Sequence, residues 1–175
     1  ALGGAAPPVR PEAAASQDRI AAHDLVLQAW AALRTVNRDA AVAARRFGEQ
    51  AIERDGDYAP GFLALAASLG VLFEQRWGRE YADVSIAQRM AAASSAAVNL
   101  APNDAHAHAL LAVASTHVLQ HERAAAEADK ALALAPSDAE VLSLVATVYQ
   151  RHGRYERAID LINRANMLDP FESMG

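Results

Sequence analysis

Three prolines near the end of the chain recur at an interval of thirty-four residues: Pro102, Pro136 and Pro170. They close the stretches "SSAAVNLAP", "EADKALALAP" and "LINRANMLDP". Proline cannot continue an α-helix, and a fixed period of this length is typical of repeat architectures. The spacing therefore predicts helical units that all end at the same point. Units of this kind stack on their neighbours into an extended array rather than around one closed core.

Helix start and stop signals lie on either side of these turns. Asn103–Asp104 offers an N-cap, and Ser137 is followed three residues later by Glu140, the spacing of a capping box. Gly153 separates two apolar segments and permits the left-handed residue that ends a helix before a tight turn. The pattern predicts helix pairs from Asp18 onward. The expected pairs are 18–36 with 39–54, 59–75 with 84–100, 105–119 with 122–134, and 139–151 with 155–168.

The last pair carries a specific residue pattern over "AEVLSLVATVYQRHGRYERAIDLINRANMLDP". With Ala139 as the first position, Ala146 and Ala158 are small, Tyr149 is aromatic, and Pro170 closes the unit. Other signature positions hold Leu142, Val145, Ile162 and Ala165. This segment resembles the tetratricopeptide repeat (TPR), a helix–turn–helix unit of thirty-four residues. The resemblance implies an all-α fold, a right-handed α-solenoid of about four TPR-like helix pairs.

The resemblance also implies a domain plan. A flexible Ala/Pro linker is expected at residues 1–16 and a TPR-like helical domain at 17–175. The expected units are 25–58, 59–104, 105–138 and 139–172. The second unit is twelve residues longer than the standard, and we expect the excess in "EQRWGREYADVS", in the first helix or the loop. Departures from the pattern, where larger residues are usual, are Gly48, His108, Ser115 and Ala128.

Composition excludes several classes of function. The net charge of −5 argues against a nucleic-acid or acidic-membrane partner, and Lys130 is the only Lys among sixteen basic residues. The longest apolar run, residues 61–73, is shorter than the ~20 residues of a membrane-spanning helix. With no Cys, thiolate metal sites are excluded. We expect a cytoplasmic protein. Because the chain does not begin with Met, we also expect it to be a fragment or processed product of a larger protein.

The sequence contains no nucleophile or phosphate-loop motif, so an enzyme and a cofactor are not expected. The histidines leave one alternative open, a metal-dependent activity. His117 and His121 are four residues apart, a metal-ligand spacing, and His106 and His108 lie earlier in the same expected helix pair. A third ligand and a general base are missing from this pattern, because "HERAA" is not the H-E-x-x-H of a zinc protease. We therefore interpret them as ordinary surface histidines.

In TPR proteins the first helix of each pair lines a concave groove, and the resemblance carries this role to twelve positions. They are Trp30, Leu33, Leu63, Ala67, Val71, His106, Leu110, Val113, His117, Leu144, Thr147 and Arg151. Most are apolar, so the set of Lys, Arg and Asn with which some relatives bind a C-terminal carboxylate is absent. The groove is expected to bind an apolar or amphipathic segment of a protein partner.

The order of the units resembles a narrower group. An "AHDLVLQAWAAL" entry and a lengthened second repeat are similar to TPR regions attached to bacterial class III nucleotide cyclases or winged-helix regulators. This implies an interaction module of a bacterial signalling protein. The alternative is a homodimerisation module, because Leu63, Ala67 and Val71 would leave one side of an apolar helix open. Met167, Leu168 and Phe171 would add an uncapped apolar surface at the chain end.

Overall fold

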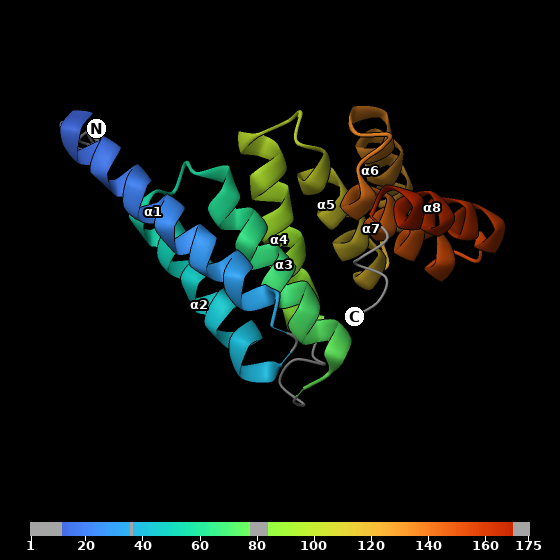
Figure 1. Cartoon of the computed structure of the whole chain (residues 1–175), viewed down its shortest axis with the longest axis horizontal. Helices are drawn as coiled ribbons and strands as arrows, with labels where there is room; N and C mark the ends of the chain where they lie inside the picture. The colour runs from blue at the N-terminus through green and yellow to red at the C-terminus, as the bar shows by residue number, and fades with distance from the viewer. Residues whose placement is uncertain (1–11, 36, 78–83, 170–175) are drawn as a thin grey trace, which may run out of the picture.

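The computed structural model of the chain describes residues 12–35, 37–77 and 84–169 (Figure 1). Within these ranges it contains eight α-helices and no β-strand, which confirms the all-α prediction. The helices are α1 Glu12–Leu33, α2 Arg38–Arg54, α3 Ala59–Gln75, α4 Val84–Leu100, α5 Ala105–His117, α6 His121–Leu134, α7 Ala139–Arg151 and α8 Tyr155–Leu168.

The helices form four consecutive pairs that stack from α1–α2 to α7–α8 (Figure 1). Each first helix also contacts the first helix of the next pair, so α1, α3, α5 and α7 lie side by side. We call the surface that these four helices share the first-helix face. The second helices α2, α4 and α6 pack between one first helix and the next. This arrangement is the predicted α-solenoid of four helix pairs.

The start of α1 and the N-cap of α7 differ from the sequence-based prediction. Helix α1 begins at Glu12, so residues 12–16 of the predicted linker are helical, while residues 1–11 lie outside the described part of the chain. Helix α7 is capped by Asp138, whose side chain accepts a hydrogen bond from the Val141 N–H at 3.0 Å. The predicted cap, Ser137, lies one residue earlier in the turn. Asp is as good a cap as Ser, so local sequence did not decide between them.

Seven of the twelve extra residues of the second unit lie in its two helices, and the other five fall between Gln75 and Val84. Compared with α5 and α6, α3 is four residues longer and α4 is three residues longer. The α3–α4 connection, residues 76–83, is five residues longer than its counterpart at 118–120. Of the segment in which we expected the insertion, residues 78–83 lie outside the described ranges.

The tight turns of the third and fourth pairs share one backbone geometry. Gly153 has φ +72°, as predicted, and the Arg154 N–H donates to the Tyr149 carbonyl at 2.8 Å. Thirty-four residues earlier Leu119 adopts φ +61°, and the Gln120 N–H donates to the Ser115 carbonyl at 2.8 Å. The repeat therefore imposes a left-handed residue on both turns, although only one of them has the glycine that favours it.

Two departures from the repeat pattern have a structural reason. Gly48 on α2 is buried against α3, where a Cβ would stand 2.8 Å from the Leu65 backbone nitrogen. A bulky residue cannot occupy this position because the two helix backbones approach too closely. His108 is 1% exposed, and its ring nitrogens contact Glu127 Oε2 at 2.5 Å and the Pro102 carbonyl at 3.0 Å. It is a buried, fully partnered side chain rather than the surface histidine we predicted.

Candidate functional site

A pocket of about 350 Å³ opens on the first-helix face, and we call it the first-helix pocket. All four pairs contribute to it. Its lining residues are Trp30, Leu63, Asp104, His106, Leu110 and Glu140. Trp30 is on α1, Leu63 on α3, Leu110 on α5 and Glu140 on α7. Four of the predicted groove residues, Trp30, Leu63, His106 and Leu110, are thus brought together.

Carboxylates surround His106 at the edge of this pocket. The His106 Nε2 lies 3.4 Å from Glu140 Oε2 and 3.5 Å from Asp138 Oδ1, and its Nδ1 lies 4.0 Å from Asp104 Oδ1. The contact with Glu140 raises the pKa of His106 above its ordinary value, partial burial opposes this, and the charges of Glu140, Asp138 and Asp104 add to the increase. The pocket therefore combines an apolar wall with a negatively charged edge.

The three carboxylates differ in how many hydrogen bonds and ion pairs they already make within the protein. Asp104 and Asp138 are the N-caps of α5 and α7, and each accepts a backbone hydrogen bond, from Ala107 and Val141 respectively. Glu140 in the first turn of α7 is more exposed, and within the described part of the chain its carboxylate pairs with His106. Glu140 is consequently the carboxylate with most capacity to accept a further partner.

An ion cluster occupies the opposite end of the first helices. Arg151 on α7 donates to both oxygens of Glu74 on α3, at 2.7 and 2.6 Å. His117 on α5 places Nε2 2.9 Å from Glu74 Oε1. Contact with His117 lowers the pKa of Glu74, partial burial opposes this, and Arg151 lowers it further. The cluster links the second pair to the fourth.

Cations are nearly absent from the helices of the first-helix face. Helices α3 and α5 contain no Lys or Arg, α1 contains only Arg19, and α7 contains only Arg151. Both arginines are neutralised, because Arg19 pairs with Asp55 and Arg151 with Glu74. The remaining helical Lys and Arg lie on α2, α4, α6 and α8. Two further arginines adjoin these helices, because Arg34 follows α1 and Arg76 is the C-cap of α3. The first helices themselves are thus less basic than the second helices.

The other predicted groove residues lie elsewhere. Val113 is buried in the large apolar core that extends from α3 to α8, and Leu144 and Ala67 pack against that core. Leu33 packs against a smaller apolar cluster formed by α1, α2 and α3. Thr147 lines a separate pocket between α7 and α8. Val71 is half-buried on α3. His117 and Arg151 form the ion cluster with Glu74.

The predicted open apolar side of α3 is closed only in part. Leu63 is 8% exposed and therefore buried, whereas Ala67 and Val71 are half-buried. Helices α1 and α5 both contact α3. The predicted set lacks the charged neighbours Glu74 and Asp104, which stand at helix ends. Glu140 is also outside that set, although it occupies the same repeat position as His106, thirty-four residues earlier.

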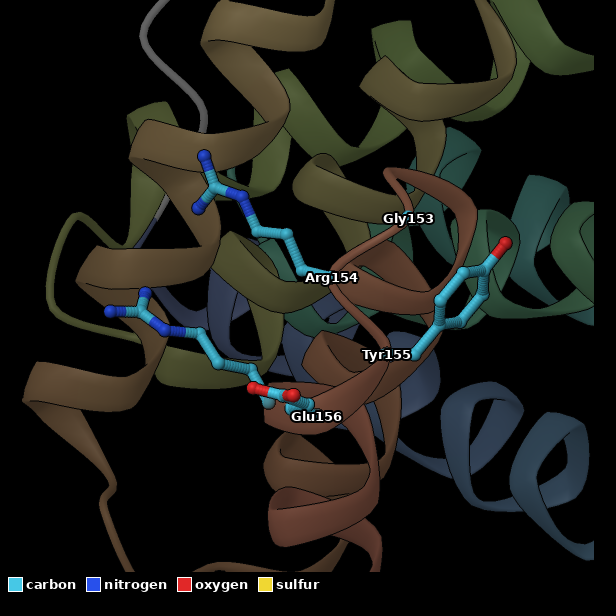
Figure 2. A pocket seen from close by; sticks show the side chains of 5 residues that line it. Gly153, Arg154, Tyr155 and Glu156 are labelled. Atoms are coloured by element: carbon cyan, nitrogen blue, oxygen red, sulfur yellow. The ribbon is translucent and has the colours of Figure 1, made fainter.

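Two other hollows lie around α8. One, of about 590 Å³, is lined by the consecutive residues Gly153 to Arg157 of the α7–α8 turn. Figure 2 shows Arg154 and Tyr155 pointing to opposite sides of this turn. Because a single turn supplies all five residues, no groups from different elements converge there. The other, about 480 Å³, lies between α7 and α8 and is mainly apolar, with Tyr155, Ile159 and Ile162 in its lining.

The histidines do not converge on a metal. His117 contacts Glu74, whereas His121 Nδ1 lies 3.3 Å from His152 Nε2. Burial lowers the pKa of His152, and the neighbouring His121 contributes to that decrease. Among the residues described by the structure, no group of three or more His, Asp or Glu side chains could hold a metal ion. Within the same ranges, none of the helices is long and apolar enough to cross a membrane.

Comparison with known proteins identifies the fold. No protein-family model matches the chain, and no curated protein matches its sequence. TTC0263, a thermophilic TPR protein of Thermus thermophilus, matches 85% of this chain and 74% of its own with TM-score 0.69 and 21% identity. The Arabidopsis OM64 TPR domain matches 79% of this chain and 98% of its own, with TM-score 0.59 and 17% identity. MamA from Desulfovibrio magneticus RS-1 matches 90% and 76%, with TM-score 0.54 and 18% identity. The chain folds as a TPR-like α-solenoid.

Proposed function

We propose that the chain is a protein-interaction module, with no chemistry of its own, that binds an apolar or amphipathic segment of a partner protein on the first-helix face. The observation that carries the proposal is the first-helix pocket, to which all four helix pairs contribute side chains. Ligand sites in proteins are typically concave, largely apolar and edged by a few polar groups. Trp30 supplies the kind of aromatic anchor that dominates binding energy in protein interfaces.

The context that we propose is a larger bacterial signalling or regulatory protein in the cytoplasm. The feature that supports it is the lengthened second pair, on which the resemblance to such regions rests. The mechanism that we propose is binding alone. The pocket is lined by an indole, two leucines, an imidazole and two carboxylates, which together offer no hydroxyl or thiol nucleophile. Among the described residues, no group of three or more His, Asp or Glu side chains could hold a metal ion.

A peptide selection tests the proposal. A library of helical peptides of about fifteen residues would be selected against the whole chain, and the selected peptides re-measured against Trp30→Ala by calorimetry. Loss of a central aromatic anchor is expected to weaken binding by about tenfold or more. The outer-face substitution Tyr155→Ala is the control and should leave binding unchanged. Selected peptides that bind Trp30→Ala as tightly as wild type would place their site elsewhere and contradict the proposal.

A second candidate function is self-association through the α7–α8 end. Ile159 and Ile162 on α8 are 60% and 40% exposed and line the apolar pocket there, and Met167 and Leu168 are also exposed. The exposure of Met167 and Leu168 agrees with the predicted apolar chain end, whereas Phe171 lies outside the described residues. An exposed apolar stripe of this kind is typical of an interface.

The preceding repeat supports a helix as the occupant of this end. Ala124 and Ala128, thirty-four residues before Ala158 and Ile162, are fully buried beneath α7. A second copy could cover the α8 surface in the same way. Light scattering on a chromatography peak tests this, with Ile159→Glu expected to convert a dimer into a monomer. Wild-type protein that is monomeric at high micromolar concentration would contradict self-association and leave the pocket proposal untouched.

A further inference from the structure

We infer that the first-helix pocket selects partner segments in which an apolar side chain stands beside a Lys or Arg. The inference rests on the proposed function and specifies the chemistry of its ligand. It combines three observations: an apolar pocket wall, a carboxylate edge, and the absence of unpaired Lys and Arg from the described first helices.

The apolar wall defines the first half of the ligand. Trp30, Leu63 and Leu110 enter the pocket from three different helices, so an aliphatic or aromatic side chain placed there is surrounded on several sides. Leu63 and Leu110 are largely buried by the protein itself, and Trp30 is partly exposed. A pocket of about 350 Å³ accepts one or two side chains rather than a whole helix. The rest of the segment would lie across the face.

The carboxylate edge defines the second half. Asp104, Asp138 and Glu140 lie around one histidine, so their negative charge exceeds the single positive charge that His106 can carry. Glu140 has the fewest other contacts and would meet the incoming cation. Acidic partners are disfavoured because like charges brought together in an interface are costly, while a Lys or Arg finds an opposite charge without a competing cation on α3 or α5.

His106 makes this recognition dependent on pH. The groups that face it are Asp104 from its own helix start and Asp138 and Glu140 from the start of α7; the pocket residues from α1 and α3, Trp30 and Leu63, are uncharged. While protonated, His106 occupies the carboxylates. As the pH rises through its elevated pKa the imidazolium loses its charge, and the carboxylates become available to the partner's cation. Binding of a basic segment should therefore strengthen as the pH rises through this range.

The experiment uses three synthetic peptides of about fifteen residues with identical Leu and Ala positions. They carry Lys, Gln or Glu at the edges of the apolar face, and calorimetry measures their affinities for the whole chain. We expect the Lys peptide to bind about tenfold or more tightly than the Glu peptide, because one like-charge contact replaces one favourable pair. Increasing salt from roughly 0.05 to 0.5 M should reduce this difference.

Variants of the protein test whether the charge preference arises at the carboxylate edge of the pocket. Glu140→Gln should weaken the Lys peptide by about two- to fivefold, as expected for a partly exposed ion pair, and leave the Gln peptide unchanged. The matched control is Glu122→Gln, which removes a first-turn Glu from α6 on the outer side. His106→Gln should abolish the rise in affinity with pH. Fluorescence of Trp30, measured with Trp77→Phe to remove the other tryptophan, reports occupation of the pocket.

The outcomes distinguish the inference from the proposed function. Peptides that bind in a Trp30-dependent way but with equal affinity for all three charge types would overturn the inference and leave the proposed function intact. If no peptide binding depends on Trp30, the proposed function fails as well. Binding of the Lys peptide that is equally weakened by Glu122→Gln and Glu140→Gln would show general charge attraction and also overturn the inference. Light scattering of the complex distinguishes occupation by peptide from self-association.

Discussion

Replacing Gly48 with alanine tests how closely the helix backbones approach in this solenoid. Gly48 lies in the middle of α2 and is buried against α3. A Cβ at this position would stand 2.8 Å from the Leu65 nitrogen, 3.0 Å from its Cα and 3.2 Å from its Cβ. Ordinary contact begins at 3.4 Å, so the helices would have to separate locally by about 0.6 Å. The obstacle is backbone, which no rotamer change can remove.

Two opposing terms set the expected magnitude. Alanine is favoured over glycine in a helix interior by about 1 kcal/mol. Overpacking a close contact costs about 1–3 kcal/mol, and a backbone obstacle belongs at the upper end of that range. We expect Gly48→Ala to lower the free energy of unfolding by about 1–2 kcal/mol. For a chain of this size this corresponds to a decrease of roughly 2–8 °C in the melting temperature.

Gly70 supplies the matched control, because it is also buried in the middle of a helix. The nearest obstacle to a Cβ at Gly70 is the Met90 Cε at 3.1 Å, the end of a flexible side chain. Gly70→Ala should therefore be neutral or slightly stabilising. Circular dichroism during heating and urea unfolding would compare both variants with wild type. A Gly48→Ala protein at least as stable as Gly70→Ala would refute the close approach of α2 and α3.

Three further predictions concern the repeat and its ion cluster. Leu119→Gly should stabilise the protein by about 0.5–1 kcal/mol, because glycine adopts the left-handed conformation of this position without the steric cost that leucine has. Gly153→Ala should destabilise the protein by about 1 kcal/mol for the same reason, and urea unfolding measures both effects. Ala112→Trp should lower the free energy of unfolding by about 1–3 kcal/mol or more, because it overpacks a fully buried position. Ala146→Trp should lower it less, because the new ring can enter the apolar pocket between α7 and α8. Equal losses in thermal melts of the two variants would contradict this prediction. The pKa of Glu74 is lowered in the folded protein, so the stability that its ionised form contributes is present above about pH 4.5 and is lost as the pH falls through the lower folded-state pKa. Glu74→Gln should therefore lose less stability than wild type in unfolding experiments below pH 4.5. The ion pair with Arg151 should contribute about 0.5–1 kcal/mol, because both partners are partly exposed.

The number and pairing of the helices could be predicted from the sequence because the signals are local. A proline every thirty-four residues, a polar cap residue before α5 and α7, and a Gly in the last turn each act within one or two turns of helix. The cap of α5 is the predicted Asp104, whereas the cap of α7 is Asp138 in place of Ser137. The start of α1 was missed because an Ala-rich stretch after prolines reads equally well as a linker or a helix. The left-handed Leu119 was also missed, since leucine rarely adopts that conformation and only the register with Gly153 indicates it.

The candidate site was only partly predictable for a different reason. The repeat register placed Trp30, Leu63, His106 and Leu110 on one face, and the structure brings these four into one pocket. Which charges stand beside that pocket depends on how each pair is rotated relative to the next. Rotation between pairs is a property of side-chain packing across the whole array, and the residues at helix starts inherit their position from it. Sequence spacing within one unit contains no information about that rotation.

Helix α3 has a special place in this array because two apolar clusters meet on it. Ala64 packs in the cluster formed with α1 and α2, whereas Leu63 and Leu69 belong to the cluster that continues to α8. Stability in a stacked array is the sum of such neighbour contacts, so the junction at α3 determines whether the first pair unfolds with the rest or separately. The first-helix pocket spans this junction, with Trp30 on one side and Leu110 on the other. A ligand bound there would contact both clusters at once, and it would therefore stabilise the junction in addition to the folded chain as a whole.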